Sequence, residues 1–320
     1  MGLDFGVNWG GLFQSSYEDG QFGKSYGDRE IPSDDDDTIS TKKPDEYIVD
    51  AAGNGDYTTI AAALTALGAS SGTIRVLAGN YLITANISLG ANQTIFGSGY
   101  GTNITTTSDI TLITLSGNRS SIFMCRIDGN NTGSSQQGIS VNGDECIIRN
   151  CWVTQMGDIG IYGSSSDRLI IDGCVVEDCT DHCVYLNDTD FSMISDCVID
   201  NSADTGMELV SALGVSIVGC KIMNHGEHGL YITGSFECLI SGNYIFSNGD
   251  NNNNGDGIYL SSENNCCIVG NSINTNDGVG VDIAATCNDI VLVGNVLLNN
   301  EDGSHTDAGT DSIIANNAVP

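Results

Sequence analysis

Carboxylate side chains recur at a fixed interval in the middle of the chain. The carboxylates at 23-residue intervals are Asp158, Asp181, Asp204 and Glu227, and Glu208 follows the third of them by four residues. If successive repeats stack about 4.8 Å apart, these groups lie about 5 to 10 Å from one another, the separation used in glycoside hydrolysis. Crowding of like charges would also raise the pKa of one of them. The candidate catalytic residues are Glu208, Asp204, Asp181 and Glu227.

Aromatic rings recur on the same segments. One column reads Tyr162, Tyr185, Glu208, Tyr231 and Tyr259, and His182 and His228 share another column, two repeats or roughly 10 Å apart. A glycine-rich column between the carboxylates and the tyrosines, which includes Gly160, Gly206, Gly229, Gly257 and Gly280, would leave a shallow furrow. Tyrosine rings beside carboxylates suit sugar rings and hydroxyls, although exposed strands commonly carry Tyr and a stacked Asp often bonds its own turn. The candidate carbohydrate-binding residues are Tyr162, Tyr185, Tyr231, Tyr259, His182 and His228.

The elements that must position these side chains belong to a repeat. Five segments, each 23 residues after the last, begin at Cys146, Leu169, Ser192, Val215 and Cys238. Looser copies precede them at residue 120 and follow them at residues 266 and 290. A fixed period of about 20 to 50 residues is the signature of a solenoid.

The pattern inside each repeat indicates about three short strands. Apolar residues alternate in short runs rich in Ile, Val and Tyr, and Gly, Asn, Asp and Ser fill the intervals. Stacked coils of this kind form an all-β parallel β-helix, here of about ten coils. A leucine-rich repeat is the alternative at this length, but it requires a Leu-rich consensus with a helical half.

The sixth position of the repeat supports this register. It is occupied in turn by Cys125, Cys151, Cys174, Cys197 and Cys220, and then by Asn243, Asn271 and Asn295. Free Cys behaves as a small buried hydrophobe, and Asn can hydrogen-bond along a stack. Neighbouring rungs are close enough for disulfides, but side chains stacked in parallel seldom reach the required dihedral angle.

The composition bounds the possible partners and surroundings. Lys and Arg number 10 against 41 Asp and Glu, a formal net charge of −31. Such acidity argues against nucleic acid or an anionic membrane as partner, and it suggests a halophilic or marine setting. No stretch is long enough to span a bilayer, and the first residues lack the basic and apolar regions of a secretion signal. With 12 Cys, this predicts folding in a reducing cytoplasm.

Residues 1–46 differ from the solenoid. We expect them to form a docking arm whose aromatic side chains fit a partner, followed by an acidic linker at 34–37; the alternative is an arm that folds back on its own solenoid. The candidate docking residues are Phe5, Trp9, Phe13 and Tyr17. The predicted domains are therefore 1–46 and 47–320. A helix over about 58–67, with Ile60, Leu64 and Leu67 on one face, would cap the first coil.

A five-residue insertion in the fifth repeat matches the start of a calcium-binding loop. The candidate ligands are Asp250, Asn252, Asn254 and Asp256. The glutamate expected at the twelfth position is Ser261, although Glu263 is near, and low sequence complexity can also produce such a match. Calcium is therefore the one cofactor that the sequence suggests.

Three segments carry a resemblance to a known group. The order V-D-x-x-G-x-G-D-Y-T-T-I-x-x-A-L from residue 49, then T-I-R-V-x-x-G-x-Y, then T-I-F-G-S-G at 94–99 resembles the opening of the pectate-lyase-like superfamily of right-handed parallel β-helices. The later G-I-Y-L-x-x-x-x-N-x-x-I-x-G-N units resemble its carbohydrate-binding and sugar-hydrolysis repeats. The resemblance covers residues 47 to about 315, and its members include pectin-active enzymes and viral tailspikes.

The resemblance is specific for fold and leaves two functions open. The lyases of the superfamily usually abstract a proton with Lys or Arg, which this face lacks, and the Asn-Thr-Asp, Asp-Asp and Gly-His-Gly set of polygalacturonases is only echoed at 225–229. We therefore expect a non-catalytic virion spike, fibre or surface-decoration protein that binds cell-surface or extracellular polysaccharide on the outside of a virion or cell. Its docking arm, residues 1–46, would bind a structural protein. Such spikes commonly form homotrimers. The alternative is a polysaccharide hydrolase or lyase on the same scaffold.

Overall fold

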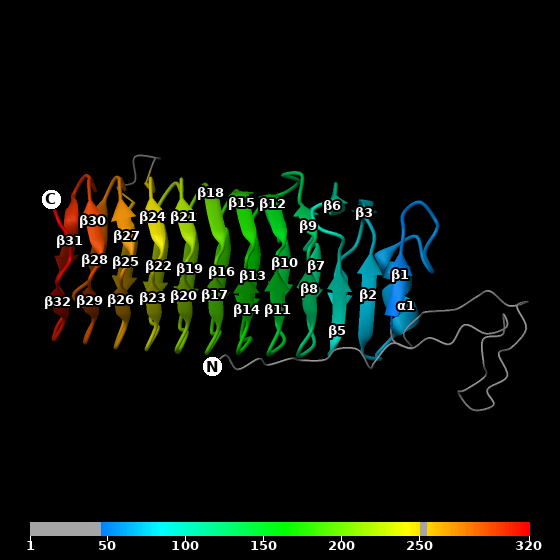
Figure 1. Ribbon diagram of the computed structural model, residues 1–320, viewed down its shortest axis with the longest axis horizontal. Coiled ribbons are helices and arrows are strands. Elements are labelled where there is room, and N and C mark those ends of the chain that lie inside the picture. The colour runs from blue at the N-terminus through cyan, green and yellow to red at the C-terminus, as the bar shows by residue number, and fades with distance from the viewer. Residues whose placement is uncertain (1–45, 250–254) are drawn as a thin grey trace, which may run out of the picture. The chain divides into compact units, whose positions relative to one another are not determined.

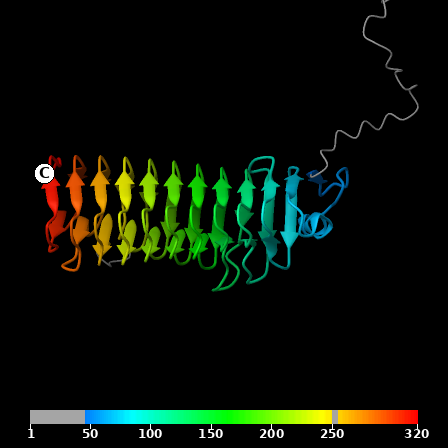
Figure 2. The same ribbon diagram turned by 90° about the horizontal axis from the view of Figure 1, so that it is seen from below.

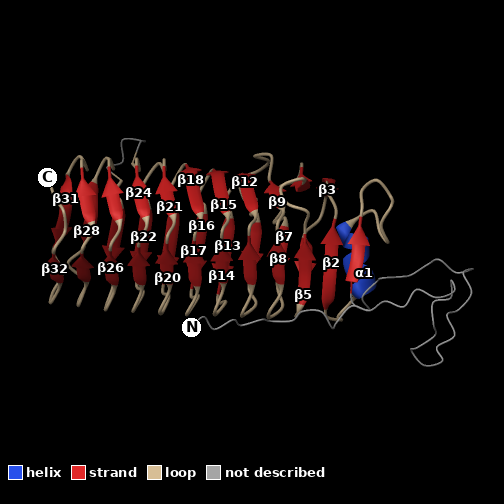
Figure 3. Ribbon diagram, in the orientation of Figure 1, coloured by secondary structure: helices blue, strands red, loops and turns tan. Residues whose placement is uncertain are grey.

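The computed structural model describes residues 46–249 and 255–320, which form a solenoid of parallel strands with one helix at its N-terminal end (Figure 1). Each complete coil contributes one strand, or rung, to each of three parallel sheets (Figure 3). Short turns join most of the strands, and 32 strands are described against a single helix, as the all-β prediction requires.

The three sheets are named here sheets A, B and C. Sheet A contains β1 (Glu46–Val49), β2 (Gly72–Val76), β5 (Gln93–Phe96), β8 (Ser121–Phe123), β11 (Ile147–Arg149), β14 (Ile170–Asp172), β17 (Met193–Ser195), β20 (Ser216–Val218), β23 (Leu239–Ser241), β26 (Cys267–Val269), β29 (Val291–Val293) and β32 (Ile313–Ala315). Sheet B contains β3 (Gly79–Ile83), β6 (Thr102–Thr106), β9 (Arg126–Asp128), β12 (Trp152–Met156), β15 (Val175–Cys179), β18 (Val198–Ser202), β21 (Lys221–Met223), β24 (Tyr244–Phe246), β27 (Ser272–Asn274) and β30 (Val296–Leu298). Sheet C contains β4 (Ile87–Leu89), β7 (Ile113–Leu115), β10 (Ile139–Val141), β13 (Ile161–Ser164), β16 (Val184–Asn187), β19 (Met207–Val210), β22 (Leu230–Thr233), β25 (Ile258–Ser261), β28 (Val279–Ile283) and β31 (Gly303–Asp307).

The solenoid is longer than the expected ten or so coils, since sheet A has 12 strands and sheets B and C have 10 each. The first coils pair in the same way as the later ones, for example Thr73 with Thr94, but they do not share the 23-residue period. Strand pairing depends on the alternation of apolar residues rather than on sequence identity. Counting only the recognisable sequence repeats therefore gives fewer coils than the structure has.

The core is a set of stacked aliphatic columns. In sheet A the central residue of each rung from β11 to β29 points inward and is buried: Ile148, Ile171, Ile194, Ile217, Ile240, Ile268 and Leu292. Residues on either side of each central residue point outward, as the two-residue period of a strand requires.

The Cys and Asn ladder predicted at the sixth position is confirmed. All 12 cysteines are free thiols, and burial raises the pKa of Cys125 to about 12. The ladder continues as amides: Asn243 Nδ2 donates to Asn271 Oδ1 at 3.0 Å, and Asn271 Nδ2 donates to Asn295 Oδ1 at 3.0 Å. Each amide also donates to a backbone carbonyl oxygen of the preceding rung of sheet A, such as Asn271 Nδ2 to Ile240 O at 2.9 Å. The polar interior is therefore hydrogen-bonded along the solenoid axis.

The predicted capping helix is present as α1 (Ile60–Leu67). It begins after Thr59, whose Oγ1 accepts the N–H of Ala62 at 3.2 Å, and it ends at Gly68, whose φ of 59° is left-handed. The helix buries Ile60, Ala63 and Leu67, while Leu64 is only half-buried. Within the described residues, no helix has the length and apolar character needed to cross a membrane.

The docking-arm residues Phe5, Trp9, Phe13 and Tyr17, with the acidic linker, lie outside the described residues. The domain boundary near residue 46 stays a prediction.

Candidate functional site

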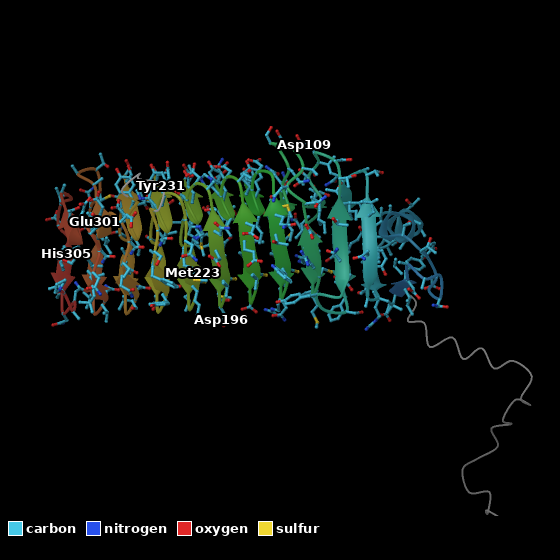
Figure 4. The ribbon with its side chains drawn as sticks, turned by 90° about the horizontal axis from the view of Figure 1, so that it is seen from above. Asp109, Asp196, Met223, Tyr231, Glu301 and His305 are labelled. Carbon is cyan, nitrogen blue, oxygen red and sulfur yellow. The ribbon has the colours of Figure 1, made fainter. Side chains whose placement is uncertain are left out.

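The tyrosine column lies on the outer side of sheet C. Tyr162, Tyr185, Glu208, Tyr231 and Tyr259 are paired in register on five consecutive rungs, each half-buried between two inward-pointing neighbours. The next residue of the column is Asp282, which was not expected there from the sequence. Figure 4 places Tyr231 on the same edge of the solenoid as Asp109, with Asp196 on the opposite edge.

The tyrosine rings stack on one another along the solenoid axis rather than standing apart. Tyr162 and Tyr185 have ring centroids 5.7 Å apart at an interplanar angle of 25°, and Tyr231 and Tyr259 have centroids 5.2 Å apart at 22°. Glu208 occupies the single rung between these two pairs, here called the Glu208 gap. With rungs about 4.8 Å apart, the residues that flank the gap are about 10 Å apart. One face of Tyr185 and one face of Tyr231 are therefore turned toward the Glu208 rung.

His182 holds Glu208 in place. Its Nδ1 lies 2.7 Å from Asp181 Oδ1, and its Nε2 is hydrogen-bonded to the Glu208 carboxylate on the next rung. Burial of the ring would lower the pKa of His182, but the two carboxylate hydrogen bonds outweigh burial and raise that pKa to about 10. His182 is thus a buried imidazolium between two carboxylates at neutral pH.

The carboxylate row, made up of Asp158, Asp181, Asp204 and Glu227, lies in the turns that lead into the strands of the tyrosine column. Burial, followed by the negative charge of Asp181, raises the pKa of Asp158, and burial followed by the charge of Asp204 raises the pKa of Glu227. The hydrogen bond from His182 lowers the pKa of Asp181. The row therefore contains, on adjacent rungs, a carboxyl group whose pKa is raised and one whose pKa is lowered, as an acid–base pair requires. Asp204 accepts the N–H of Thr205 at 2.7 Å.

Three of these side chains could also hold a cation. One ligand atom from each of Asp181, His182 and Asp204 lies within 4.8 Å of the other two. Both ring nitrogens of His182 are already hydrogen-bonded to carboxylates, which raise its pKa, so a metal would have to displace a ring proton that these carboxylates hold in place. A metal-binding role for these three residues was not expected from their spacing in the sequence.

His228 and Asp256 form a second pair at the C-terminal side of the gap. His228 stacks on Tyr259 with centroids 5.0 Å apart, and its Nδ1 accepts the backbone N–H of Asp256 at 3.0 Å. Burial lowers the pKa of His228 and raises the pKa of Asp256 to about 7. The Asp256 carboxylate also accepts the N–H of Val279 at 2.7 Å. Of the predicted calcium ligands, Asp250, Asn252 and Asn254 lie outside the described residues, so the calcium loop stays a prediction.

The expected glycine furrow is wrong, because the glycine column faces the core. A Cβ at Gly206 would lie 2.3 Å from the ring of His225, and one at Gly229 would lie 2.7 Å from Asn248 Nδ2. These positions precede the strands of sheet C, where the chain turns inward and leaves room for buried side chains of sheet B and its turns. His225, part of the echoed Gly-His-Gly segment, is such a buried side chain: its Nδ1 is 2.8 Å from Ser202 Oγ, and burial lowers its pKa to about 3.

Longer connections border the face at its N-terminal side. The segments 107–112 and 129–138, between sheets B and C, project from the solenoid (Figure 2). Asp109 joins them by accepting the N–H groups of Ser134 and Ser135 at 3.3 and 3.2 Å. A separate hollow of about 350 Å³ lies near α1, lined by Thr59, Tyr81 and Ile87 among others, and not beside the carboxylate row. The candidate site is thus an open face that is bordered at one end.

Comparison with known proteins identifies the fold. Residues 111–252 match the family described as the right-handed beta helix region. The fold is a right-handed parallel β-helix. No curated protein sequence matches the chain.

The solved structures that are similar to this chain include both enzymes and viral proteins. The mannuronan C-5 epimerase A-module of Azotobacter vinelandii is similar at a TM-score of 0.67 and 18% identity, covering 76% of this chain and 72% of that one. The Dettilon tailspike protein has a TM-score of 0.61 and 15% identity, covering 79% of this chain and 54% of the tailspike, so this chain spans about half its length. A pectate lyase, Pel9A, has a TM-score of 0.57 and 15% identity, covering 87% and 79%. At these identities the likeness shows the β-helix fold alone.

Proposed function

We propose that this protein binds polysaccharide through the outer face of sheet C, as a non-catalytic spike, fibre or surface-decoration protein. The observation that carries the proposal is the Glu208 gap, where two tyrosine pairs present ring faces toward one rung and His182 fixes a carboxylate between them. Aromatic faces stack on sugar rings, and fixed carboxylates accept hydrogen bonds from sugar hydroxyls. An open face accepts an internal stretch of a polymer without needing a chain end.

A rigid scaffold supports this role. Every rung of the site is bonded to its neighbours in sheet C, and the core beneath Tyr185 and Tyr231 is formed by fully buried residues such as Leu186 and Leu230. Binding to such a preorganised surface orders few side chains, which keeps its entropic cost low. Tailspikes are among the structural neighbours, which agrees with a spike although it does not decide between spike and enzyme.

The proposal includes the N-terminal arm. A spike must be attached, and we propose that residues 1–46 dock to a structural protein of a virion or cell surface through Phe5, Trp9, Phe13 and Tyr17. A homotrimer and folding in the cytoplasm before assembly belong to the same proposal. Deleting residues 1–45 should leave glycan binding and the thermal transition of the solenoid unchanged and abolish assembly; a large fall in melting temperature would instead make the arm part of the fold.

Binding to soluble polysaccharides tests the main proposal. A panel of dextran, mannan, chitosan and polygalacturonate would be titrated against the full chain by calorimetry. Tyr185→Ala should weaken binding of whichever polymer binds by roughly 1 to 2 kcal/mol, the scale of one aromatic contact with its buried area. Tyr244→Ala is the matched control, since Tyr244 is an exposed tyrosine on sheet B. No binding to any polymer, or equal losses for the two variants, would contradict the proposal.

A polysaccharide hydrolase or lyase is the second candidate. It is favoured by the raised pKa of Glu227 beside Asp204, because a glycosidase needs one carboxyl group that stays protonated and one that is ionised. Release of shorter oligosaccharides from the same panel would establish this activity.

A further inference from the structure

The described residues separate their charges between the faces of the solenoid. All Lys and Arg side chains of 46–249 and 255–320 lie on sheets A and B or in the turns that lead into them: Arg75, Arg119, Arg126, Arg149, Arg168 and Lys221. The arginines are paired with carboxylates there, as Arg149 is with Asp172 at 2.8 Å and Arg168 with Glu145 at 3.0 Å. Within that part of the chain, the strands of sheet C and the turns that lead into them carry no Lys or Arg.

Sheet C instead gathers carboxylates around the Glu208 gap. Those on its outer side and in the turns that lead into it include Asp158, Asp181, Asp204, Glu208, Glu227, Asp256 and Asp282. The positive charge of His182 is matched by its two partners, Asp181 and Glu208, and burial lowers the pKa of His228. The field over the gap is therefore negative.

Such a field selects among glycans by charge. A polymer with a carboxylate on each ring would bring like charges against this row and leave them without a cationic partner, so it would be repelled. A protonated amine on a sugar ring would lie between carboxylates and tyrosine faces, and ring faces attract cations as carboxylates do.

We infer that the Glu208 gap binds a polysaccharide whose sugar rings carry free amino groups, with one ring between Tyr185 and Tyr231 and its ammonium group toward Glu208 and Asp204. This inference rests on the proposed glycan-binding function and names the chemical class of the glycan.

Three hexasaccharides of matched length test the inference with the full chain: glucosamine, N-acetylglucosamine and galacturonate hexamers. Titration would be done at about physiological ionic strength, where long-range attraction to the net charge of −31 is largely screened. The glucosamine hexamer should bind at least about tenfold more tightly than its acetylated form. The galacturonate hexamer should not bind, with or without calcium.

Paired variants separate the site from the overall charge. Glu208→Gln and Asp196→Asn each remove one negative charge, and Asp196 lies at the opposite edge from Tyr231 (Figure 4). Glu208→Gln should weaken glucosamine-hexamer binding by about tenfold or more while Asp196→Asn changes it little. Tyr185→Ala, which leaves the charge unchanged, should weaken it similarly, and Tyr244→Ala should not.

The outcomes distinguish the inference from the proposal beneath it. Equal losses for Glu208→Gln and Asp196→Asn would show attraction to net charge only and overturn the inference. Binding of the acetylated or galacturonate hexamer that equals or exceeds glucosamine binding and depends on Tyr185 would overturn the amino-sugar class but support glycan binding. Binding of none of the three would count against both.

Discussion

His182 reaches from its own coil to the next and holds the carboxylate of Glu208 through Nε2, while its Nδ1 lies 2.7 Å from Asp181 Oδ1. Glu208 replaces a ring in the tyrosine column, so this contact fixes the one residue that interrupts the column. The imidazolium supplies the local positive charge that lets neighbouring carboxylates remain close together.

The first prediction is an energetic coupling between these two residues. Unfolding in urea at pH 6 of the wild type, His182→Gln, Glu208→Gln and the double variant should give a coupling free energy of about 1 to 3 kcal/mol. The pKa of His182 is raised to about 10 in the folded protein, so its contribution is complete below the unfolded value near 6.5 and declines as the pH rises toward 10. The coupling should therefore shrink at pH 10. Additive single variants at pH 6 would contradict the prediction.

A second prediction concerns Glu263, a fully buried glutamate inside the solenoid. Burial raises its pKa to about 7, although its Oε1 accepts the N–H of Ser235 at 3.0 Å. The folded protein therefore holds this proton more tightly than the unfolded chain, and stability falls as the pH rises from about 4.5 to 7. Glu263→Gln should remove the contribution of Glu263 to this fall in stability, about 3 kcal/mol. The measurement is the free energy of unfolding in urea at pH 5 and pH 8. The exposed Glu237→Gln is the control, and the same pH profile in all three proteins would contradict the prediction.

The asparagine ladder gives a third prediction. Asn271 bonds to Asn243, Ile240 and Asn295, so Asn271→Ala would leave several buried polar groups without partners. The loss should be about 2 to 4 kcal/mol in urea unfolding. Asn274→Ala, on a half-buried outward position of β27, should cost less than about 1 kcal/mol. Similar losses for the two variants would show that the ladder adds no stability of its own.

The register of the site could be predicted from the sequence because the repeat fixes it. Constant spacing together with buried Val184, Met207 and Leu230 puts Tyr185, Glu208 and Tyr231 on successive rungs of one outer column, as the pairing confirms. Periodicity of apolar residues also predicts the three-sheet coil, because burial, not side-chain detail, determines it.

Contacts between columns could not be predicted in the same way. Whether His182 turns toward Asp181, toward Glu208 or toward solvent depends on rotamers, and the repeat does not encode these. The direction of the glycine column was wrong for a related reason: strict alternation applies inside a strand, whereas Gly206 and Gly229 stand in the turn just before one. The stacking of Tyr162 on Tyr185 follows from the short distance between rungs. It was not expected from the sequence, and it leaves the stacked faces of these two rings unavailable to a sugar.

A fourth prediction concerns salt and calcium. Carboxylates about one rung apart repel one another within the screening length of dilute salt, and the chain carries a net charge of −31. The melting temperature should rise as NaCl increases from low to molar concentration. Calcium at millimolar concentration should add stability beyond NaCl of equal ionic strength if the loop at Asp250–Asp256 binds it, and Asp250→Asn should remove that excess. Equal effects of the two salts on the melting temperature would show that the loop does not bind calcium.

The last prediction separates a passive binding face from an enzyme. Glu208→Gln keeps the shape of the side chain and much of its hydrogen bonding but removes its charge and its capacity to transfer a proton. We expect the wild type to release no shorter products from the polysaccharide that it binds, as measured by chromatography of any released oligosaccharides. Glu208→Gln should then change only the affinity for the polysaccharide. An enzyme would lose turnover by about 100- to 10,000-fold in this variant, while Asp196→Asn, on the opposite edge, would keep it. Cleavage by the wild type that vanishes in Glu208→Gln would therefore make the carboxylate row an active site, with Glu227, whose pKa burial raises, as its proton donor.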